Sequence, residues 1–589
     1  MSDNDMQGLL DRLCRRLFAR MAPGGWWEGR LSSSALSTAV TAYALAQVDQ
    51  NLHAPHIQRA LSWLQHNQNR DGGWGDTPDS PSNLSTTMLC RCALTVDEEG
   101  FKACVKKAEG YIAARAGGTD PDSIARYVLK FYGKDLTFSA PILTMCALSG
   151  VLGPESGAWK YVPQLPFEFS IFPHRMFQYL RLQVVSYAIP ALVAVGLVRH
   201  RHRPSWNPVA RIARTLATRK ALSVAQRCQP DSGGFLEASP LTAFVTMCLC
   251  RSGHREHPIV KRATEFLIAS IRDDGSLPID TNLATWVTTL SVNSLPEERM
   301  EHLNTDAIRR WLLDQQHRVE HPFTHAEPGG WAWTDLSGGV PDADDTSGAL
   351  LALKRLSYGD SASIDAAREG IEWLLGLQNS DGGIPTFCRG WGKLPFDQSC
   401  PDLTAHALQA WDEWRGDMTG NLKDRIQAAS FRARQYLERV QVADGSWLPR
   451  WFGNQQNEDH GNPVYGTAQV LKSLVRVTQG GDSEALRRGA EYLVSAQNED
   501  GGWGGRKDLP STIEETALAV AGLASCRNVD AHESIRRGVE WLEQCESHHP
   551  DLPSAPIGLY FASLWYDERL YPVIFSIQAV SLAQKALAD

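Results

Sequence analysis

The 589-residue chain has no excess of positive charge and no long apolar run. Its formal net charge is −9, and nucleic-acid binding needs a basic surface, so we expect no nucleic-acid partner. The longest apolar run, residues 184–198, is shorter than the roughly 20 residues that a membrane-spanning helix needs. A basic cluster at residues 199–203 follows it, so this segment fits either a buried helix or a helix on a membrane surface.

Several other motifs are missing. The twelve cysteines are scattered and show no zinc or redox spacing, so we predict a reducing, cytoplasmic setting. The acidic start of the chain lacks the pattern of a signal peptide. The chain also lacks an Asp-Asp-x-x-Asp motif for a magnesium-bound diphosphate. We therefore expect neither a metal nor a cofactor.

Tryptophan is abundant, with nineteen residues, and much of it falls in an internal repeat. In each full copy an aromatic residue and a leucine precede an Asp-Gly-Gly-Trp-like turn, whose last residue lies eleven positions after the aromatic. Full copies begin at Trp63, Trp373, Tyr436 and Tyr492, and weaker copies begin at Phe266 and Trp311. Apolar residues at helical spacing lie between the copies, which favours helix hairpins closed into an α/α barrel. An open solenoid is the alternative.

Three carboxylates, Asp342, Asp344 and Asp345, precede an apolar run that reads as a helix. Carboxylates this close raise one another's pKa, so the cluster is a candidate proton donor. The alternative is a structural helix cap, because Asp side chains accept hydrogen bonds from the free N–H groups at a helix start.

The repeats and residues 341–346 together resemble the QW repeats and the Asp-x-Asp-Asp-Thr acid motif of the class II terpene cyclases, squalene-hopene cyclase type. The resemblance covers nearly the whole chain. It implies an all-α protein of two α/α barrels with a large apolar cavity between them. Residues 1–20 and 260–589 would form the catalytic barrel, and residues 21–259 would form an inserted second barrel.

The same resemblance assigns roles at the acid. Asp344 would deliver the proton, and Asp342 and Asp345 would tune it as a coupled set. Asp402 and His406 match the family's Asp-Val-Thr-Ala-His segment, in which the His hydrogen-bonds the acid and the Asp orients that His.

Aromatic residues would form the cavity wall, because ring faces stabilise carbocations without acting as bases. We expect Trp333 and Trp451 in this wall, and Tyr465 at the acid end, where it would join the water network that restores the proton. The chain departs from hopene-forming members at Ile279 and residues 182–187, and also at residues 452–464, which leaves the product open. The apolar segment at residues 559–566 fits either the cavity or the core.

The resemblance therefore implies protonation-initiated cyclisation of a linear polyprene, squalene first, to a polycyclic triterpene such as hopene. This is an isomerase or intramolecular-transferase reaction. One alternative is a class II cyclase of a prenyl diphosphate or a meroterpenoid, and a diphosphate would need Arg or Lys at the cavity mouth. Another is a non-catalytic or zinc-dependent prenyl-binding barrel. The family also implies peripheral or monotopic attachment to the cytoplasmic side of a membrane, and a homodimer.

Overall fold

The computed structural model describes residues 2–133, 136–173, 176, 189–322, 324–357, 359–387, 397–477, 483–526, 529–549, 551–559 and 564–588. The family departure expected at residues 182–187 lies outside the described residues, as do residues 560–563 of the apolar segment near the C-terminus.

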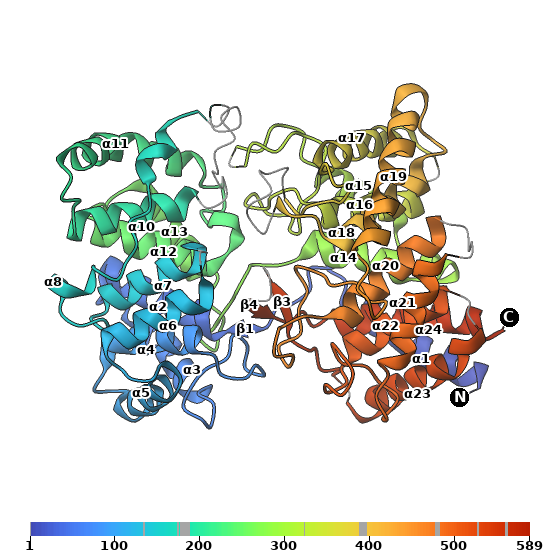
Figure 1. Cartoon of the computed structure of the whole chain (residues 1–589), viewed down its shortest axis with the longest axis horizontal. Coiled ribbons are helices and arrows are strands. Elements are labelled where there is room, and N and C mark those ends of the chain that lie inside the picture. Colours follow the sequence, from blue (N-terminus) through green and yellow to red (C-terminus); the bar gives the residue numbers. More distant parts are fainter. Residues whose placement is uncertain are drawn as a thin grey trace.

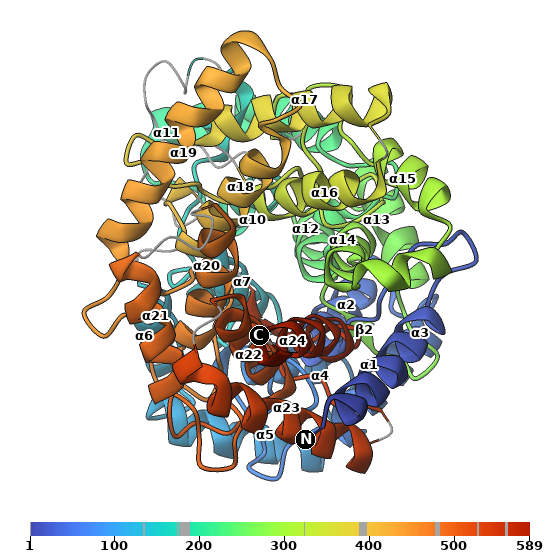
Figure 2. The same ribbon diagram turned by 90° about the vertical axis from the view of Figure 1, so that its right-hand side faces the viewer.

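The C-terminal part of the chain forms a ring of inner helices that pack side by side and close on themselves (Figure 2). The ring consists, in order, of α14 (Ala284–Ser294), α16 (Ala343–Leu356), α18 (Pro401–Trp414), α20 (Pro463–Val477), α22 (Ile513–Ser525) and α24 (Tyr571–Ala588). Contact between α24 and α14 closes it. The outer layer consists of α15 (Thr305–Asp314), α17 (Ser361–Leu377), α19 (Gly420–Val440), α21 (Glu484–Ser495), α23 (His532–His548) and α1 (Asp3–Phe18).

The N-terminal part forms a second ring built in the same manner. Its inner helices are α2 (Ala35–Asp49), α4 (Leu84–Leu94), α7 (Leu136–Leu148), α10 (Ile189–His202) and α12 (Ser239–Arg251). Its outer helices are α3 (Ala54–His66), α5 (Lys102–Ala116), α6 (Pro121–Tyr132), α11 (Pro208–Arg227) and α13 (Pro258–Ala269), and a short helix, α8 (Glu155–Ala158), follows α7. Closure of both rings confirms the predicted all-α architecture of two α/α barrels and excludes the open solenoid.

Inner and outer helices differ in how much of their surface is buried. The inner helix α22 is buried at every residue from Ile513 to Ala524, whereas the outer helix α23 buries one face. The apolar run before the basic cluster belongs to the inner layer, because α10 is buried from Val193 to Val198. For its described part, the buried-helix interpretation of residues 184–198 is therefore right.

Two hydrophobic cores fill the barrels, which stand side by side (Figure 1). One core consists of residues between 6 and 31 and between 279 and 586. The other consists of residues between 35 and 267 together with Cys400, Leu403 and Trp451 from the C-terminal part. Where the chain passes between them, β1 (Ser33–Ser34) pairs antiparallel with β2 (Leu277–Pro278). The hairpin of β3 (Ile557–Leu559) and β4 (Leu564–Tyr566) lies between the barrels in Figure 1.

Recurring hydrogen bonds fix the repeat turns. In the last copy, the Trp503 indole N–H donates to the Leu493 carbonyl at 2.7 Å, and its backbone N–H donates to Thr516 Oγ1 at 2.9 Å. The amide of Gln497 donates to the carbonyl of Ser534 on the next outer helix at 2.9 Å. Equivalent glutamine bonds are made by Gln68, Gln229, Gln316, Gln378 and Gln441. The repeats thus tie inner helices to outer ones, and their buried tryptophans serve the fold.

Candidate active site

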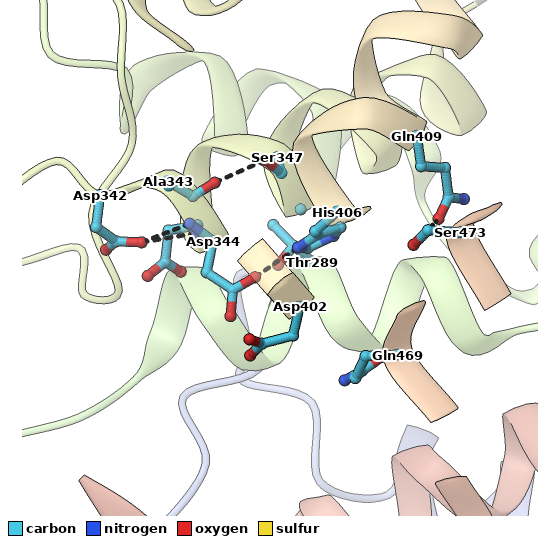
Figure 3. A network of polar contacts seen from close by, with 12 residues as sticks. Thr289, Asp342, Ala343, Asp344, Ser347, Asp402, His406, Gln409, Gln469 and Ser473 are labelled. Atoms are coloured by element: carbon cyan, nitrogen blue, oxygen red, sulfur yellow. Dashed lines mark hydrogen bonds and ion pairs between the residues drawn. The ribbon is translucent and has the colours of Figure 1, made fainter. Parts of the chain in front are cut away.

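The acidic cluster lies at the start of inner helix α16. Asp342 is the N-cap residue, and its Oδ1 accepts hydrogen bonds from the backbone N–H groups of Asp344 and Asp345, both at 2.9 Å (Figure 3). The predicted capping role is therefore right for Asp342. It fixes the first turn of the helix and so directs the side chain of Asp344.

Asp344 pairs with a histidine from the neighbouring inner helix. His406 Nδ1 on α18 lies 2.6 Å from Asp344 Oδ1 (Figure 3). Only 17% of the Asp344 side chain and 20% of the His406 side chain are exposed, so water screens this contact weakly. The two residues lie 62 positions apart in the sequence, and packing of α16 against α18 brings them together.

The remaining carboxyl groups of the cluster bind protons more tightly than free ones. Burial, together with the charge of Asp344, raises the pKa of Asp342 to about 7. Burial and the charge of Asp342 raise the pKa of Asp345 well above its ordinary value. Burial, with the charge of Asp344, raises the pKa of Asp402 to about 6. Because these groups interact, their protons belong to the cluster as a whole.

Asp402 lies one helical turn before His406 on α18 and borders the same space as Asp344. Its carboxylate accepts a hydrogen bond from the thiol of Cys400. Among the described residues, His406 Nδ1 is hydrogen-bonded to Asp344 and not to Asp402. Besides burial, the interaction between the charges of Asp402 and Asp344 contributes to the raised pKa of Asp402.

An apolar cavity of about 340 Å³ lies between the two barrels and reaches Asp342, Asp344 and Asp345. Its aromatic lining consists of Tyr132, Phe138, Phe244, Trp286, Trp333, Phe387, Trp451, Phe452 and Tyr566. The described part of the lining contains no lysine or arginine. Both expected wall residues, Trp333 and Trp451, are part of it.

Phe387 connects the two expected tryptophans. Its ring lies 6.2 Å from Trp333 and 5.4 Å from Trp451 between centroids, with both contacts edge-on. Trp286 also borders the acid, because its ring meets the edge of the His406 ring at 6.4 Å. Sequence reasoning missed Phe387 and Trp286.

A positional signal could have found Trp286. It lies in the first turn of α14, as Asp344 lies in the first turn of α16 and Leu403 in that of α18. Cavity residues therefore recur where inner helices begin. Tyr566, in the apolar segment near the C-terminus, also lines the cavity.

Tyr465 lies behind the acid, away from the apolar cavity. It borders a second space with Asp344, Asp402 and His406, inside the C-terminal ring. Its hydroxyl accepts a hydrogen bond from Gln469 at 3.2 Å, and its ring packs on Phe452 at 4.6 Å. Burial raises its pKa well above the ordinary value, so it stays a neutral phenol.

In the described part of the chain, no helix is both long and apolar enough to cross a membrane. Over the same ranges, no three His, Cys, Asp or Glu side chains gather into a group that could hold a metal ion.

Comparison with known proteins identifies the family. The models of the squalene-hopene cyclase N-terminal and C-terminal domains match residues 10–143 and 283–551. A probable squalene–hopene cyclase of Sinorhizobium fredii is 24% identical over 83% of this chain and 82% of that protein. Enfumafungin synthase of Hormonema carpetanum is 24% identical over 92% of this chain, which spans only 45% of that protein's length.

A solved structure shares the fold. Ent-copalyl diphosphate synthase from Streptomyces platensis aligns over 99% of both chains with a TM-score of 0.57 and 18% sequence identity. The two domain models match segments of both barrels in the order expected from the repeats and the acid motif. The chain belongs to the squalene-hopene cyclase family of class II terpene cyclases.

Proposed function

We propose that this protein protonates a linear polyprene, squalene or a close relative, and cyclises it to a polycyclic triterpene. The observation that carries the proposal is the position of Asp344. One carboxylate oxygen is bonded to His406, and the residue borders an apolar, aromatic cavity.

The geometry suits proton transfer to an alkene. Such a reaction needs an acid whose conjugate base is stabilised as it forms. In its charged form, His406 donates from Nδ1 to Asp344 Oδ1, which leaves Oδ2 to hold the proton. The O–H bond at Oδ2 breaks as a C–H bond forms at the terminal alkene, and a tertiary carbocation results. Asp342 and Asp345, with raised pKa values, add little negative charge while protonated.

The cavity wall suits the cation that follows. Each aromatic face contributes roughly 0.5–2 kcal/mol to a nearby cation, and more when water is excluded. Trp333, Phe387 and Trp451 form a continuous aromatic series along this wall. A neutral aromatic wall lets the charge move along the substrate without early capture by a base.

The charge of the lining favours a neutral substrate. A diphosphate needs cationic partners, and the described lining contains none. Its other ionisable groups include the carboxyl groups of Asp76 and Asp280 in addition to the acidic cluster. None of these can supply the positive charge that a diphosphate needs, so squalene-like hydrocarbons fit better than prenyl diphosphates.

We also propose that α11 attaches the protein to a membrane surface, which would suit an insoluble substrate. The exposed fractions of Trp206, Val209, Ile212 and Leu216, on or just before α11, are 95, 74, 59 and 77%. Exposed basic residues, Arg201, Arg203, Arg211, Arg219 and Lys220, surround them. An apolar patch with a basic rim suits a surface that carries anionic lipids.

The experiment offers squalene and, separately, geranylgeranyl diphosphate to detergent-solubilised protein and identifies the lipid products by mass spectrometry. We expect an isomer or hydrate of squalene from the wild type and none from Asp344→Asn. Asp314→Asn, on outer helix α15, is the matched control and should match the wild type. Conversion of geranylgeranyl diphosphate but not of squalene would show that the substrate is a prenyl diphosphate. Equal conversion by Asp344→Asn would refute the role of Asp344.

Two further points are proposals about organisation. We propose that the two cores are two domains, with the chain crossing at β1 and β2, somewhat C-terminal to the limits predicted from the sequence. The homodimer and the cytoplasmic side of the membrane stay predictions.

A further inference from the structure

A second cavity runs along the inside of the C-terminal ring. Its volume is about 370 Å³, and all of the inner helices of this ring contribute to its lining. At one end it borders Asp344, Asp402 and His406, and at the other it borders the exposed residues Glu297 and Lys585. We call this space the axial channel. It could hold a file of water molecules, since each takes roughly 30 Å³ in the liquid.

Two neighbouring inner helices line the axial channel with the same spacing of polar residues. On α18 and α20 these residues lie at positions i, i+4, i+7 and i+11, which is one face of a helix. They are Asp402, His406, Gln409 and Glu413 on α18, and Tyr465, Gln469, Lys472 and Arg476 on α20. Eleven residues of helix rise about 16 Å, so each row extends well away from the acid.

Hydrogen bonds connect these rows with each other and with α24. Ser473, beside Lys472 on α20, donates to Gln409 on α18 at 3.2 Å (Figure 3). Lys472 Nζ donates to Gln578 Oε1 on α24 at 2.8 Å. Gln469, one turn nearer the acid, donates to Tyr465. Polar groups therefore follow one another from Lys472 toward Asp344.

Lys472 is unusual because it is an enclosed ammonium without a carboxylate partner among the described residues. Burial, together with the charge of Arg476, lowers its pKa to about 7, whereas the charge of Asp344 acts in the opposite direction. The charged or titratable groups that border the channel around it are Glu297, Asp344, Lys354, Arg355, Asp402, His406, Glu413, Tyr465, Arg476 and Lys585. Lys354, Arg355 and Arg476 are paired with Asp417, Glu297 and Glu413.

The proposed reaction requires that Asp344 be supplied with a new proton after each turnover. Each turnover transfers the proton of Asp344 to the substrate, and the carboxylate must regain one before the next turnover. The apolar cavity holds the polyprene during that time and offers mainly hydrocarbon surface. The axial channel reaches the same carboxylate with polar groups.

The family resemblance already implies a water network that restores the proton to Asp344. We propose that in this chain Lys472 is the positioning residue that relays the proton along the axial channel. This inference rests on the proposed function. The ammonium of Lys472 releases a proton through channel water to the Asp344 carboxylate and becomes a neutral amine. Asp344 becomes a carboxylic acid, and the amine then takes a proton from solvent at the channel mouth. No other reactant is needed.

The test compares one turnover with many. Lys472→Gln keeps a polar group near Gln578 but cannot carry a proton. Lys423→Gln, exposed on outer helix α19, is the matched control. With enzyme in excess over squalene, we expect Lys472→Gln to yield product at the wild-type rate, because a single turnover needs no proton return. With squalene in excess, the rate should fall by about a hundredfold, the scale of general acid–base assistance.

The pH profile gives an independent readout. The steady-state rate of the wild type should fall as the pH rises through about 7, where the ammonium is lost. Lys472→Gln should lack this fall. Gln469→Leu interrupts the row of polar residues but keeps Lys472, so it should lower the steady-state rate and leave the single-turnover rate unchanged.

Normal single-turnover product also shows that a variant is folded. If Lys472→Gln kept the wild-type steady-state rate and pH profile, the inference would be overturned while the proposed function stood. If Lys472→Gln lost single-turnover product, Lys472→Met would take its place as the test variant, and a wild-type steady-state rate in Lys472→Met would likewise overturn the inference. If the wild type itself made no product, the proposed function would fall, and this inference with it.

Discussion

Replacing His406 with glutamine tests how the acid gains its strength. The bond between His406 and Asp344 is short, at 2.6 Å, and both side chains are largely enclosed. A hydrogen bond to a charged group contributes about 1.5–3 kcal/mol. Since each 1.36 kcal/mol of barrier changes a rate tenfold, loss of this bond should slow cyclisation by about 10- to 150-fold. Weak screening by water favours the upper part of that range.

The assay measures the single-turnover rate of squalene consumption with enzyme in excess, so that binding and proton return do not limit it. Glutamine is polar and close to histidine in size but carries no charge, so the fold and the cavity should persist, which circular dichroism and thermal unfolding would check. His548→Gln, at the exposed end of α23, is the matched control and should keep the wild-type rate. A rate for His406→Gln within twofold of the wild type would refute electrostatic assistance by His406.

Further predictions concern the wall, the repeats and a buried carboxyl group. Trp333→Leu should release products with fewer rings, seen by mass spectrometry, because part of the aromatic support for the cation is lost; an unchanged product would remove Trp333 from the wall. Trp503→Phe leaves the buried Leu493 carbonyl without its indole donor and should lower the free energy of unfolding by about 1–3 kcal/mol, measured in urea, without altering the product. Burial raises the pKa of Glu568 to about 7 from an ordinary 4.5, so the wild type should lose stability as the pH rises between these values. Glu568→Gln, whose amide oxygen can still accept from the backbone, should flatten that loss; equal slopes for both proteins would contradict it.

The repeat turns and the helix cap at the acid could be predicted from the sequence because their contacts join residues close together in the chain. A repeat turn is local, since Trp503 bonds to Leu493 ten residues earlier, so constant spacing shows it directly. The cap at Asp342 is local in the same sense. The contact between Asp344 and His406 is not local, and only the resemblance to a known motif pair predicted it.

The axial channel could not be predicted, although its rows are visible in the sequence. A polar face at helical spacing on α20 looks like the solvent-facing side of an ordinary amphipathic helix. Ring closure turns that face inward, so Lys472 and Gln469 become interior groups. Phe387 was missed for a related reason, because it lies in a connection before α18 and no periodic pattern includes it.

The direction of the inner helices links the acid to the route of the cation. The first turns of α14, α16 and α18 face the apolar cavity, and those of α4 and α12 face it from the other barrel. Each helix N-terminus carries roughly half a positive charge, which favours the carboxylate that Asp344 becomes. The same field disfavours a cation near these helix ends. In the proposed reaction this field favours movement of the cation away from Asp344 along the aromatic wall, and the axial channel behind the acid would return its proton.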